Sequence, residues 1–400
     1  MPASITFLPV DCGDMTLITL ADSAGTTILI DTNIRGAADD PKDSTRDVAR
    51  DLRERLKKDE NGRPYVDVFL NSHPDADHIR GFQNHFHVGP LSAYSDDKKK
   101  DTEKRIVMRE IWSSPIVYRR AERAKLPLSD DAKAFKTEAK RRVKVNQDKQ
   151  FKGVGDGDRI QVMGEDKDGK TDKLGPILRK IDESFSTVNG RDVKGYFTAL
   201  LLAPLPPSKN EDDEDLLAKN RSSVILNITL GSDANTADAC KFLTAGDAEV
   251  EVWERLWRKH KGNKELLGYD LLLAPHHCSW HSLSHDSWSE LREKAQVSKE
   301  ARNALSQARS GASIVASSKA IKDDDKDPPC IRAKREYVGI VDAVKGQFHC
   351  TGEHPDEKAP APLEFKISKN GPSAPAKKEA GSKAAGATSA ASVAMPHGQK

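Results

Sequence analysis

The chain has 400 residues, of which 36% are hydrophobic and 32% charged, and its formal net charge is +2 at pH 7. This length allows one large α/β domain or two smaller ones. No apolar run approaches the ~18 residues that a membrane helix needs, and the first residues carry no signal-peptide pattern. The five cysteines are scattered and odd in number, which favours reduced thiols over a disulfide framework. We therefore expect a soluble, cytoplasmic protein without a membrane span.

The predicted elements alternate between strands and helices. Three short strands, over 5–10, 15–20 and 26–30, are separated by Gly and Asp turns. A helix is predicted over 43–58, where apolar residues recur at helical spacing, and a strand over 65–70. Later strands are predicted over 155–163, 197–203, 223–230, 240–244 and 269–274, and a second helix over 248–260. This α/β (α+β) pattern suits two facing sheets with helices outside them.

Residues 71–78, Asn-Ser-His-Pro-Asp-Ala-Asp-His, form the most informative motif of the chain. A loop at a strand end frees side chains from strand alternation, so that they can converge on a cation. Imidazole nitrogen together with carboxylate oxygen suits divalent metals such as Zn, Mn or Fe. The motif therefore predicts a metal site made by His73, Asp75, Asp77 and His78, and the alternative is a polar surface loop.

The order His-x-Asp-x-Asp-His after a hydrophobic strand resembles the signature of metallo-β-lactamase-fold hydrolases. That signature usually has His at the position of Asp75. The Asp variant is similar to the hydrolase domain of the bacterial DNA-uptake competence proteins (ComEC type) and their free-standing relatives. Further segments resemble the family pattern in the expected order: 10–14, 28–32, 220–226, 242–247 and 271–279. The resemblance spans about 4–368 and implies an αββα sandwich with the metal site along one edge between the sheets.

The resemblance also implies a two-metal hydrolase in which an activated water attacks phosphorus or a carbonyl carbon. Asp247, at a Gly turn after a strand, is expected to bridge the two cations, and one of His276 and His277 is expected to be a further ligand, with His277 preferred. The carboxylate of Asp75 makes the site harder than usual, which moves the expected metal from Zn towards Mn. Asp77 and His276 are the expected catalytic residues, and His276 would give a proton to the leaving group or hold a phosphate oxygen.

Other residues are expected to support these ligands. Asp14 and Asp31 are candidates for orienting ligand imidazoles, and for Asp14 the alternative is a plain turn residue. The family's usual third imidazole has no counterpart between Asp77 and Asp247, and Asn220 is expected to help there through its amide oxygen. Ser223 and Ser279 are expected to contact the substrate. Cys278 stands where the family has glycine and is expected to be a small buried residue.

Two segments stand apart from this pattern. Within a helical insertion of about 97–150, residues 118–150 carry eleven basic and five acidic residues. They predict a wall for nucleic acid or another phosphodiester, a surface for a protein partner, or a solvated helix face. The acidic stretch 211–215 is expected to be a solvated loop. From about 369 an Ala-, Ser-, Gly- and Lys-rich sequence predicts a disordered tail, which leaves 1–368 as the hydrolase domain.

The sequence thus predicts a metal-dependent hydrolase that holds two divalent ions, Zn or Mn, and acts as a phosphodiesterase or nuclease. A second hypothesis is hydrolysis of a small phosphoester, a nucleotide or an amide. A third is a metal-stabilised scaffold that binds a protein partner and catalyses nothing.

Overall fold

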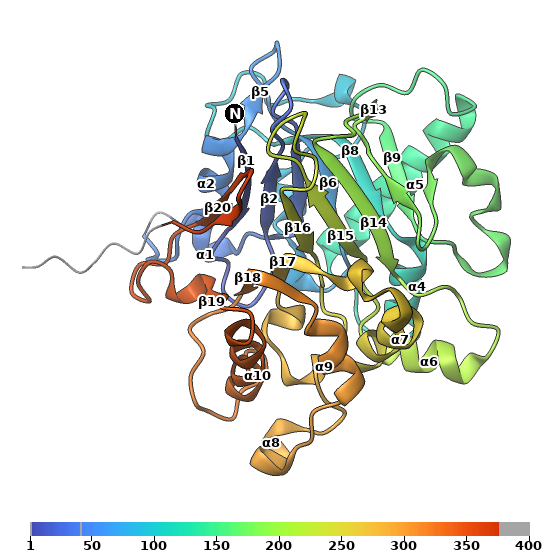
Figure 1. Ribbon diagram of the computed structural model, residues 1–400. Coiled ribbons are helices and arrows are strands. Elements are labelled where there is room, and N and C mark those ends of the chain that lie inside the picture. Colours follow the sequence, from blue (N-terminus) through green and yellow to red (C-terminus); the bar gives the residue numbers. More distant parts are fainter. Residues whose placement is uncertain (1, 41, 376–400) are drawn as a thin grey trace, which may run out of the picture.

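The computed structural model describes residues 2–40 and 42–375. Its strands form two large mixed sheets that pack on each other, and helices cover the outer surfaces (Figure 1). The mixed α/β class predicted from the sequence is therefore confirmed. Within the described ranges, no helix has both the length and the hydropathy that crossing a bilayer requires.

The first sheet has ten strands with a parallel centre. Strand β6 (Pro64–Leu70) lies between β3 (Thr27–Ile30) and β8 (Val107–Ser113), and all three run in one direction. Strand β2 (Thr16–Thr19) runs antiparallel to β3, so β2 begins at the edge where β3 ends. The other strands are β1 (Ala3–Phe7), β5 (Lys57–Lys58), β9 (Arg159–Met163), β10 (Leu178–Arg179), β20 (Leu363–Ser368) and β21 (Gly371–Ser373).

The second sheet has seven strands. Strands β16 (Cys240–Leu243), β17 (Tyr269–Leu273), β18 (Ala308–Ala316) and β19 (Gln347–Cys350) are parallel neighbours. The antiparallel part consists of β11 (Ser184–Phe185), β14 (Phe197–Ala203) and β15 (Ile225–Leu230). Two small ribbons lie outside both sheets, β4 (Thr32–Asn33) with β7 (Ile79–Arg80) and β12 (Thr187–Val188) with β13 (Arg191–Asp192).

One apolar core joins the two sheets. Phe7 of β1 meets Phe242 of β16 edge to face, with ring centroids 5.8 Å apart. Along β3, Ile28 and Ile30 enter this core, whereas Leu29 points to the helices on the outer face. Because both faces of β3 are covered, its sequence is a continuous apolar run rather than an alternating one.

Helices cover the outer face of each sheet. On the first sheet these are α2 (Val48–Arg55), α3 (Phe82–His85) and α5 (Asp130–Asp148), and on the second α7 (Val250–His260), α9 (Lys299–Leu305) and α10 (Ile331–Asp342). The predicted helix over 248–260 is confirmed as α7, which buries Val250 and Trp253. Shorter helices are α1 (Gly36–Asp39), α4 (Pro115–Arg123), α6 (Glu211–Lys219) and α8 (Trp288–Leu291).

The predicted helical insertion over 97–150 is partly wrong. Its residues 107–113 form β8, a strand in the middle of the first sheet, and the helices are α4 and α5. Nor are these helices merely solvated, since Arg120 is buried beside Glu214 at 2.8 Å, and Phe135 enters the outer core. Most basic residues of 118–150 make ion pairs: Arg119, Arg120, Arg123, Lys133, Lys136, Arg141, Arg142 and Lys144.

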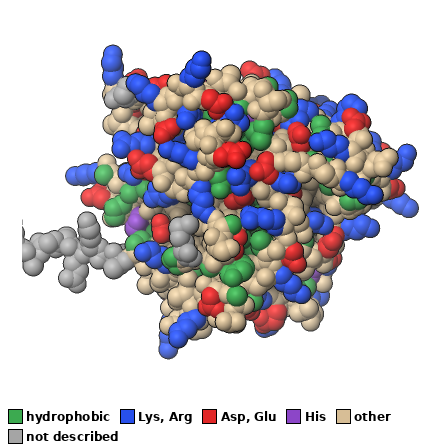
Figure 2. Space-filling model, turned by 90° about the horizontal axis from the view of Figure 1, so that it is seen from above, with side chains coloured by type: hydrophobic (Ala, Val, Ile, Leu, Met, Phe, Trp, Pro, Cys, Tyr) green, Lys and Arg blue, Asp and Glu red, His purple; other side chains and the backbone are tan. Residues whose placement is uncertain are grey.

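Positive and negative side chains are mixed on the surface. On the face drawn in Figure 2, Lys and Arg side chains are interspersed with Asp and Glu, and no broad area of one sign stands out. This agrees with the ion pairs of α4 and α5. An extended wall for a polyanion is therefore not evident on the face in view.

The acidic stretch 211–215 is not a loop but the first half of α6. Asn210 caps this helix by accepting a hydrogen bond from the Asp212 backbone N–H, and acidic residues in a first turn are favoured by the helix dipole. Leu217 and Ala218, near the end of the helix, are buried.

The predicted tail begins too early at 369. Residues 371–373 form β21, which pairs with β20. The rest of the predicted tail, 376–400, lies outside the described residues.

Candidate metal site

The carboxyl ends of parallel strands from both sheets meet at one edge, which is where open α/β sheets place their ligands. The predicted site residues lie in the loops that follow these strands. Asp31 follows β3, 73–78 follow β6, Asp247 follows β16, and 276–277 follow β17. Asp14 precedes β2, whose antiparallel direction brings it to the same edge.

One oxygen of Asp247 faces two imidazoles. Its Oδ1 atom lies 3.0 Å from His78 Nε2 and 3.4 Å from His277 Nε2. His277 Nε2 also lies 3.3 Å from Asp77 Oδ2. We name these four residues the Asp77 group, and their ligand atoms all lie within 4.8 Å of one another.

The other oxygen of Asp247 faces a second set of donors. Its Oδ2 atom lies 3.3 Å from His73 Nε2 and 3.6 Å from His276 Nε2. Asp75 Oδ2 lies 3.9 Å from His73 Nε2. His73, Asp75 and Asp247 form the Asp75 group, and His276 lies next to it.

The donor spacing and burial fit divalent cations. Ligands held ~2.1 Å from a tetrahedral ion are ~3.4 Å apart, close to the separations within both groups. His73 Nε2 and Asp247 Oδ1 are buried, and although each lies 3.0–3.4 Å from groups of this cluster, neither meets hydrogen-bond geometry with any described residue. Buried polar atoms of this kind are normally paired or coordinate a metal. The two groups could therefore hold metal ions.

Hydrogen bonds fix the orientation of the His78 ring. Asp31 Oδ2 lies 2.8 Å from His78 Nδ1, and the Ser72 backbone N–H donates to Asp31 Oδ1 at 2.7 Å. Asn71 Nδ2 donates to Asp31 Oδ1 at 3.2 Å. Asp14 Oδ1 lies 3.4 Å from His277 Nδ1. Both carboxylates thus lie beside the nitrogens that face away from Asp247, as an orienting role requires.

A tight backbone turn separates the two adjacent histidines. His276, His277 and Cys278 have φ of 49°, 53° and 70°, values that side chains larger than glycine rarely adopt. His276 and His277 consequently face different oxygens of Asp247. Cys278 is fully buried in the apolar core of the second sheet.

The charges of the cluster are strongly coupled. Burial alone would raise the pKa of Asp247, but the surrounding imidazoles, His276 first, hold it well below its usual range. For His277, burial acts against protonation, yet Asp247 and the hydrogen bonds with Asp14 and Asp77 raise the pKa to about 10. Burial lowers the pKa of His276 to about 3. At neutral pH His276 is therefore neutral and has no extra proton to donate.

Arg221 and Glu249 join the cluster although no sequence pattern marked them. The guanidinium of Arg221 forms an ion pair with Asp75, and its Nε atom lies 3.3 Å from Glu249 Oε1. Glu249 Oε1 also lies 3.7 Å from His276 Nδ1, and burial raises the pKa of Glu249 to about 7. One signal was present in the sequence, since Arg221 adjoins Asn220 in the family-like segment.

Asn220, Ser223 and Ser279 lie elsewhere than expected. Asn220 ends α6, and its side chain donates to the Leu216 carbonyl rather than reaching the ligands. Ser223 is buried, and its hydroxyl accepts a hydrogen bond from the Asp247 backbone N–H, so it positions a ligand. Ser279 is also buried, and its hydroxyl accepts from the His281 backbone N–H. A substrate contact by either serine would need a different arrangement.

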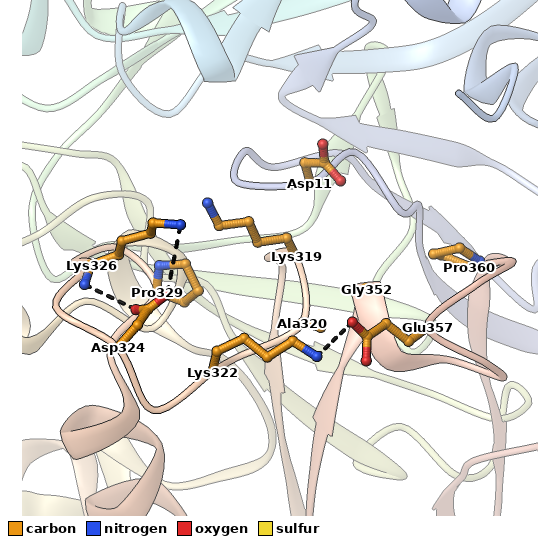
Figure 3. Close-up of a pocket in the computed structure, with 10 residues that line it drawn as sticks. All are labelled: Asp11, Lys319, Ala320, Lys322, Asp324, Lys326, Pro329, Gly352, Glu357 and Pro360. Atoms are coloured by element: carbon orange, nitrogen blue, oxygen red, sulfur yellow. Dashed lines mark hydrogen bonds and ion pairs between the residues drawn. The ribbon is translucent and has the colours of Figure 1, made fainter. Parts of the chain in front are cut away.

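A hollow of about 280 Å³ lies next to the loop that carries Asp14 (Figure 3). Asp11 is one of its lining residues, and Ser317 ties the Asp11–Asp14 turn to β18 through a 2.6 Å hydrogen bond to the Gly13 carbonyl. The charges of its lining residues are balanced. Three are lysines, Lys319, Lys322 and Lys326, and three are acidic, Asp11, Asp324 and Glu357. This hollow has no evident preference for an anion.

No protein-family model matches this chain, and no curated protein matches it either.

Proposed function

We propose that the chain is a metal-dependent hydrolase with the αββα sandwich of metallo-β-lactamases, similar to the hydrolase domain of ComEC-type competence proteins. The observation that carries this proposal is Asp247, whose two oxygens each face a separate set of imidazoles and carboxylates. A carboxylate shared in this way is typical of two-metal hydrolases. The order of motifs along the chain supports the same class.

We assign one divalent ion, Zn or Mn, to each group. Asp77, His78 and His277 would hold one ion and His73 and Asp75 the other, with Asp247 shared. Because His276 Nε2 lies 3.6 Å from Asp247 Oδ2, we assign it as a donor that completes the Asp75 group instead of as a proton donor. This would supply the imidazole that the sequence lacked between Asp77 and Asp247.

When bound, such a metal pair supplies positive charge and a water of lowered pKa. The protein's own residues then have three tasks. Asp31 and Asp14 keep the rings of His78 and His277 in position, Asp247 keeps the two groups together, and Arg221 adds a positive charge beside Asp75. Asp77, with 32% of its side chain exposed, is the acidic residue of its group most open to solvent.

Phosphodiesters are the proposed substrate class. Arg221 pairs with Asp75 and Glu249. We propose that an anionic ester at the cluster would take over part of these contacts, because a guanidinium can donate paired hydrogen bonds to phosphate oxygens. The ion pairs within α4 and α5 leave less free positive charge for a polymer than the sequence implied. Cleavage of a small diester is therefore expected, and cleavage of nucleic acid is a separate outcome of the test.

The test measures hydrolysis of bis(p-nitrophenyl) phosphate and of a labelled single-stranded oligonucleotide after removal of metal and reloading with Zn or Mn. We expect turnover only after reloading and its loss in Asp77→Asn and Asp247→Asn. Asp22→Asn is the matched control, because Asp22 is also a buried loop carboxylate but bonds Thr26 at the other end of β3. Undiminished turnover after chelation, or a purified chain that takes up no metal, would refute the proposal and favour a scaffold.

A further inference from the structure

A second cavity lies between α4, α5 and β9, away from the metal ligands. Its volume is about 400 Å³, within the ~300–1,000 Å³ typical of small-molecule sites. Apolar side chains from different elements form one part of its wall: Pro115 and Tyr118, Ala139 and Val143, Ile160 and Val162, and Leu174. Basic residues outnumber acidic ones around it: Arg119, Lys136, Lys140, Lys144 and Lys170 against Glu122 and Asp166.

The acidic residues are already engaged. Glu122 forms an ion pair with Lys136, and Asp166 forms one with Arg119 Nη2. The other terminal nitrogen of Arg119, Nη1, is buried and has no hydrogen-bond partner within the described ranges. Lys140 is exposed and makes no ion pair with any described residue. Lys144 and Lys170 pair with Asp148 and Asp168, which are not lining residues. Lys140 is therefore the basic lining residue that has no ion pair among the described residues, and it lies beside an apolar wall that the hollow of Figure 3 does not have.

We propose that this cavity binds a small amphipathic anion and that Tyr118 transmits its occupancy to the metal cluster. The ligand class has an apolar body, aromatic or short-chain, and one phosphate, sulfonate or carboxylate group. The body replaces water on the apolar wall. The anionic group accepts a hydrogen bond from the unpaired ammonium of Lys140, and the guanidinium of Arg119 adds positive charge at the same cavity.

The connection to the cluster is a short chain of hydrogen bonds. Tyr118, one of the residues that line the cavity, donates from its hydroxyl to Asn71 Oδ1 at 2.7 Å. Asn71 Nδ2 donates to Asp31 Oδ1 and to the His78 carbonyl, at 3.2 and 3.1 Å. A ligand packed on Tyr118 thus restricts the residue that holds Asp31, and Asp31 orients His78. This second part rests on the proposed metal site, whereas anion binding does not.

Calorimetry with 2-naphthalenesulfonate tests the binding site in the full chain. We expect saturable one-to-one binding, at least about tenfold tighter than that of 2-naphthol or inorganic sulfate, since each lacks one half of the ligand. Val143→Trp, which fills the cavity, and Lys140→Glu, which reverses charge at its rim, should each weaken binding about tenfold. Lys149→Glu, the same charge change just after α5 and outside the cavity lining, should leave it unchanged. Equal binding of sulfonate and naphthol, or equal binding by wild type and Lys140→Glu, would overturn the assignment.

Metal affinity tests the transmission. With saturating 2-naphthalenesulfonate, we expect Zn or Mn affinity, measured by chelator competition, to rise about fivefold or more. Tyr118→Phe keeps the ring but removes the hydroxyl, so it should retain sulfonate binding and lose this increase. An unchanged metal affinity in the wild type would refute transmission. Sulfonate binding by a chain that takes up no metal would refute the proposed function but not the cavity.

Discussion

Asp31 Oδ2 lies 2.8 Å from Nδ1 of His78, whose opposite nitrogen faces Asp247. The carboxylate is fully buried and also accepts hydrogen bonds from the Ser72 backbone and Asn71. Asp31 therefore fixes the ring in the orientation that presents Nε2 to the cluster. Its position just after β3 ties that orientation to the parallel centre of the first sheet.

Asp31→Ala should lower metal affinity about 10- to 100-fold, because the ring of His78 loses its orienting partner. Chelator competition with Zn or Mn measures the change. Asp22→Ala removes a buried carboxylate from the opposite end of β3 and should leave metal affinity unaltered. An equal loss in both variants would mean that general destabilisation, and not orientation of His78, causes the effect.

Metal stoichiometry should separate the two groups. Asp77→Asn weakens the Asp77 group and Asp75→Asn the Asp75 group, so each variant should retain about one of two metals per chain. Asp247→Asn alters the shared residue and should lose both. Elemental analysis after gel filtration gives the counts. Full loss on either single-group change would mean that the ions cannot be held independently.

Arg120→Ala should destabilise the fold by about 3–5 kcal/mol, because Glu214 then remains buried without its partner. Arg120 also donates to three other acceptors, which are the Leu205 carbonyl, the Pro206 carbonyl and the Ser222 hydroxyl. Each of them loses a hydrogen bond in the variant. Denaturant titration measures the free energy of unfolding. Arg123→Ala, on the same helix but with exposed ion pairs, should change it little. A comparable loss in both variants would contradict the role assigned to the buried pair.

Because of Glu110, the free energy of unfolding should fall as the pH rises towards neutrality. Burial raises the pKa of this carboxyl group in β8 to about 7, although the Asn189 backbone N–H donates to it. The folded state therefore holds a proton that the unfolded state releases near pH 4.5. The stabilisation that this bound proton provides is complete below the pKa of the unfolded state and is lost by about pH 7. The free energy of unfolding should therefore fall by about 3 kcal/mol across this range.

Glu110→Gln keeps an acceptor for Asn189 and cannot titrate, so its unfolding free energy should vary less between pH 4.5 and 7. Denaturant titrations of both proteins across this range give the difference. Parallel pH profiles for the wild type and the variant would show that Glu110 does not titrate in the expected window.

The spacing of apolar residues in the sequence correctly predicted the strands and the helix that have a clearly apolar run or face. Strands β2, β3 and β6 and helix α7 lie close to their predicted ranges, because unbroken apolar runs or helical spacing decide such segments. The loop 73–78, Asp247 and the 276–277 pair come together because strand ends carry them to one edge. Asp14 and Asp31 also lie where a ligand-orienting residue should be.

Tertiary contacts decided the rest. Residues 211–215 are helical because the end of α6 is buried and Glu214 pairs with Arg120. These two residues are 94 positions apart in the sequence. Arg221 reaches Asp75 across 146 residues, and no local spacing indicates such a contact. Asn220 does not reach the metal ligands, because it lies at the end of α6. Ser223 is buried and bonds the Asp247 backbone instead of contacting a substrate. The misses at Glu214, Arg221 and Ser223 involve partners remote in sequence, whereas Asn220 bonds Leu216 four residues earlier.

Strand β1, over Ala3–Phe7, is hydrogen-bonded on one side to β2 and on the other to β20, over Leu363–Ser368. During synthesis on the ribosome, the early strands therefore wait for a neighbour made more than 350 residues later. Until then β1 offers an open, apolar edge to other nascent chains. A chaperone that covers this edge should consequently raise the yield of folded protein in cells.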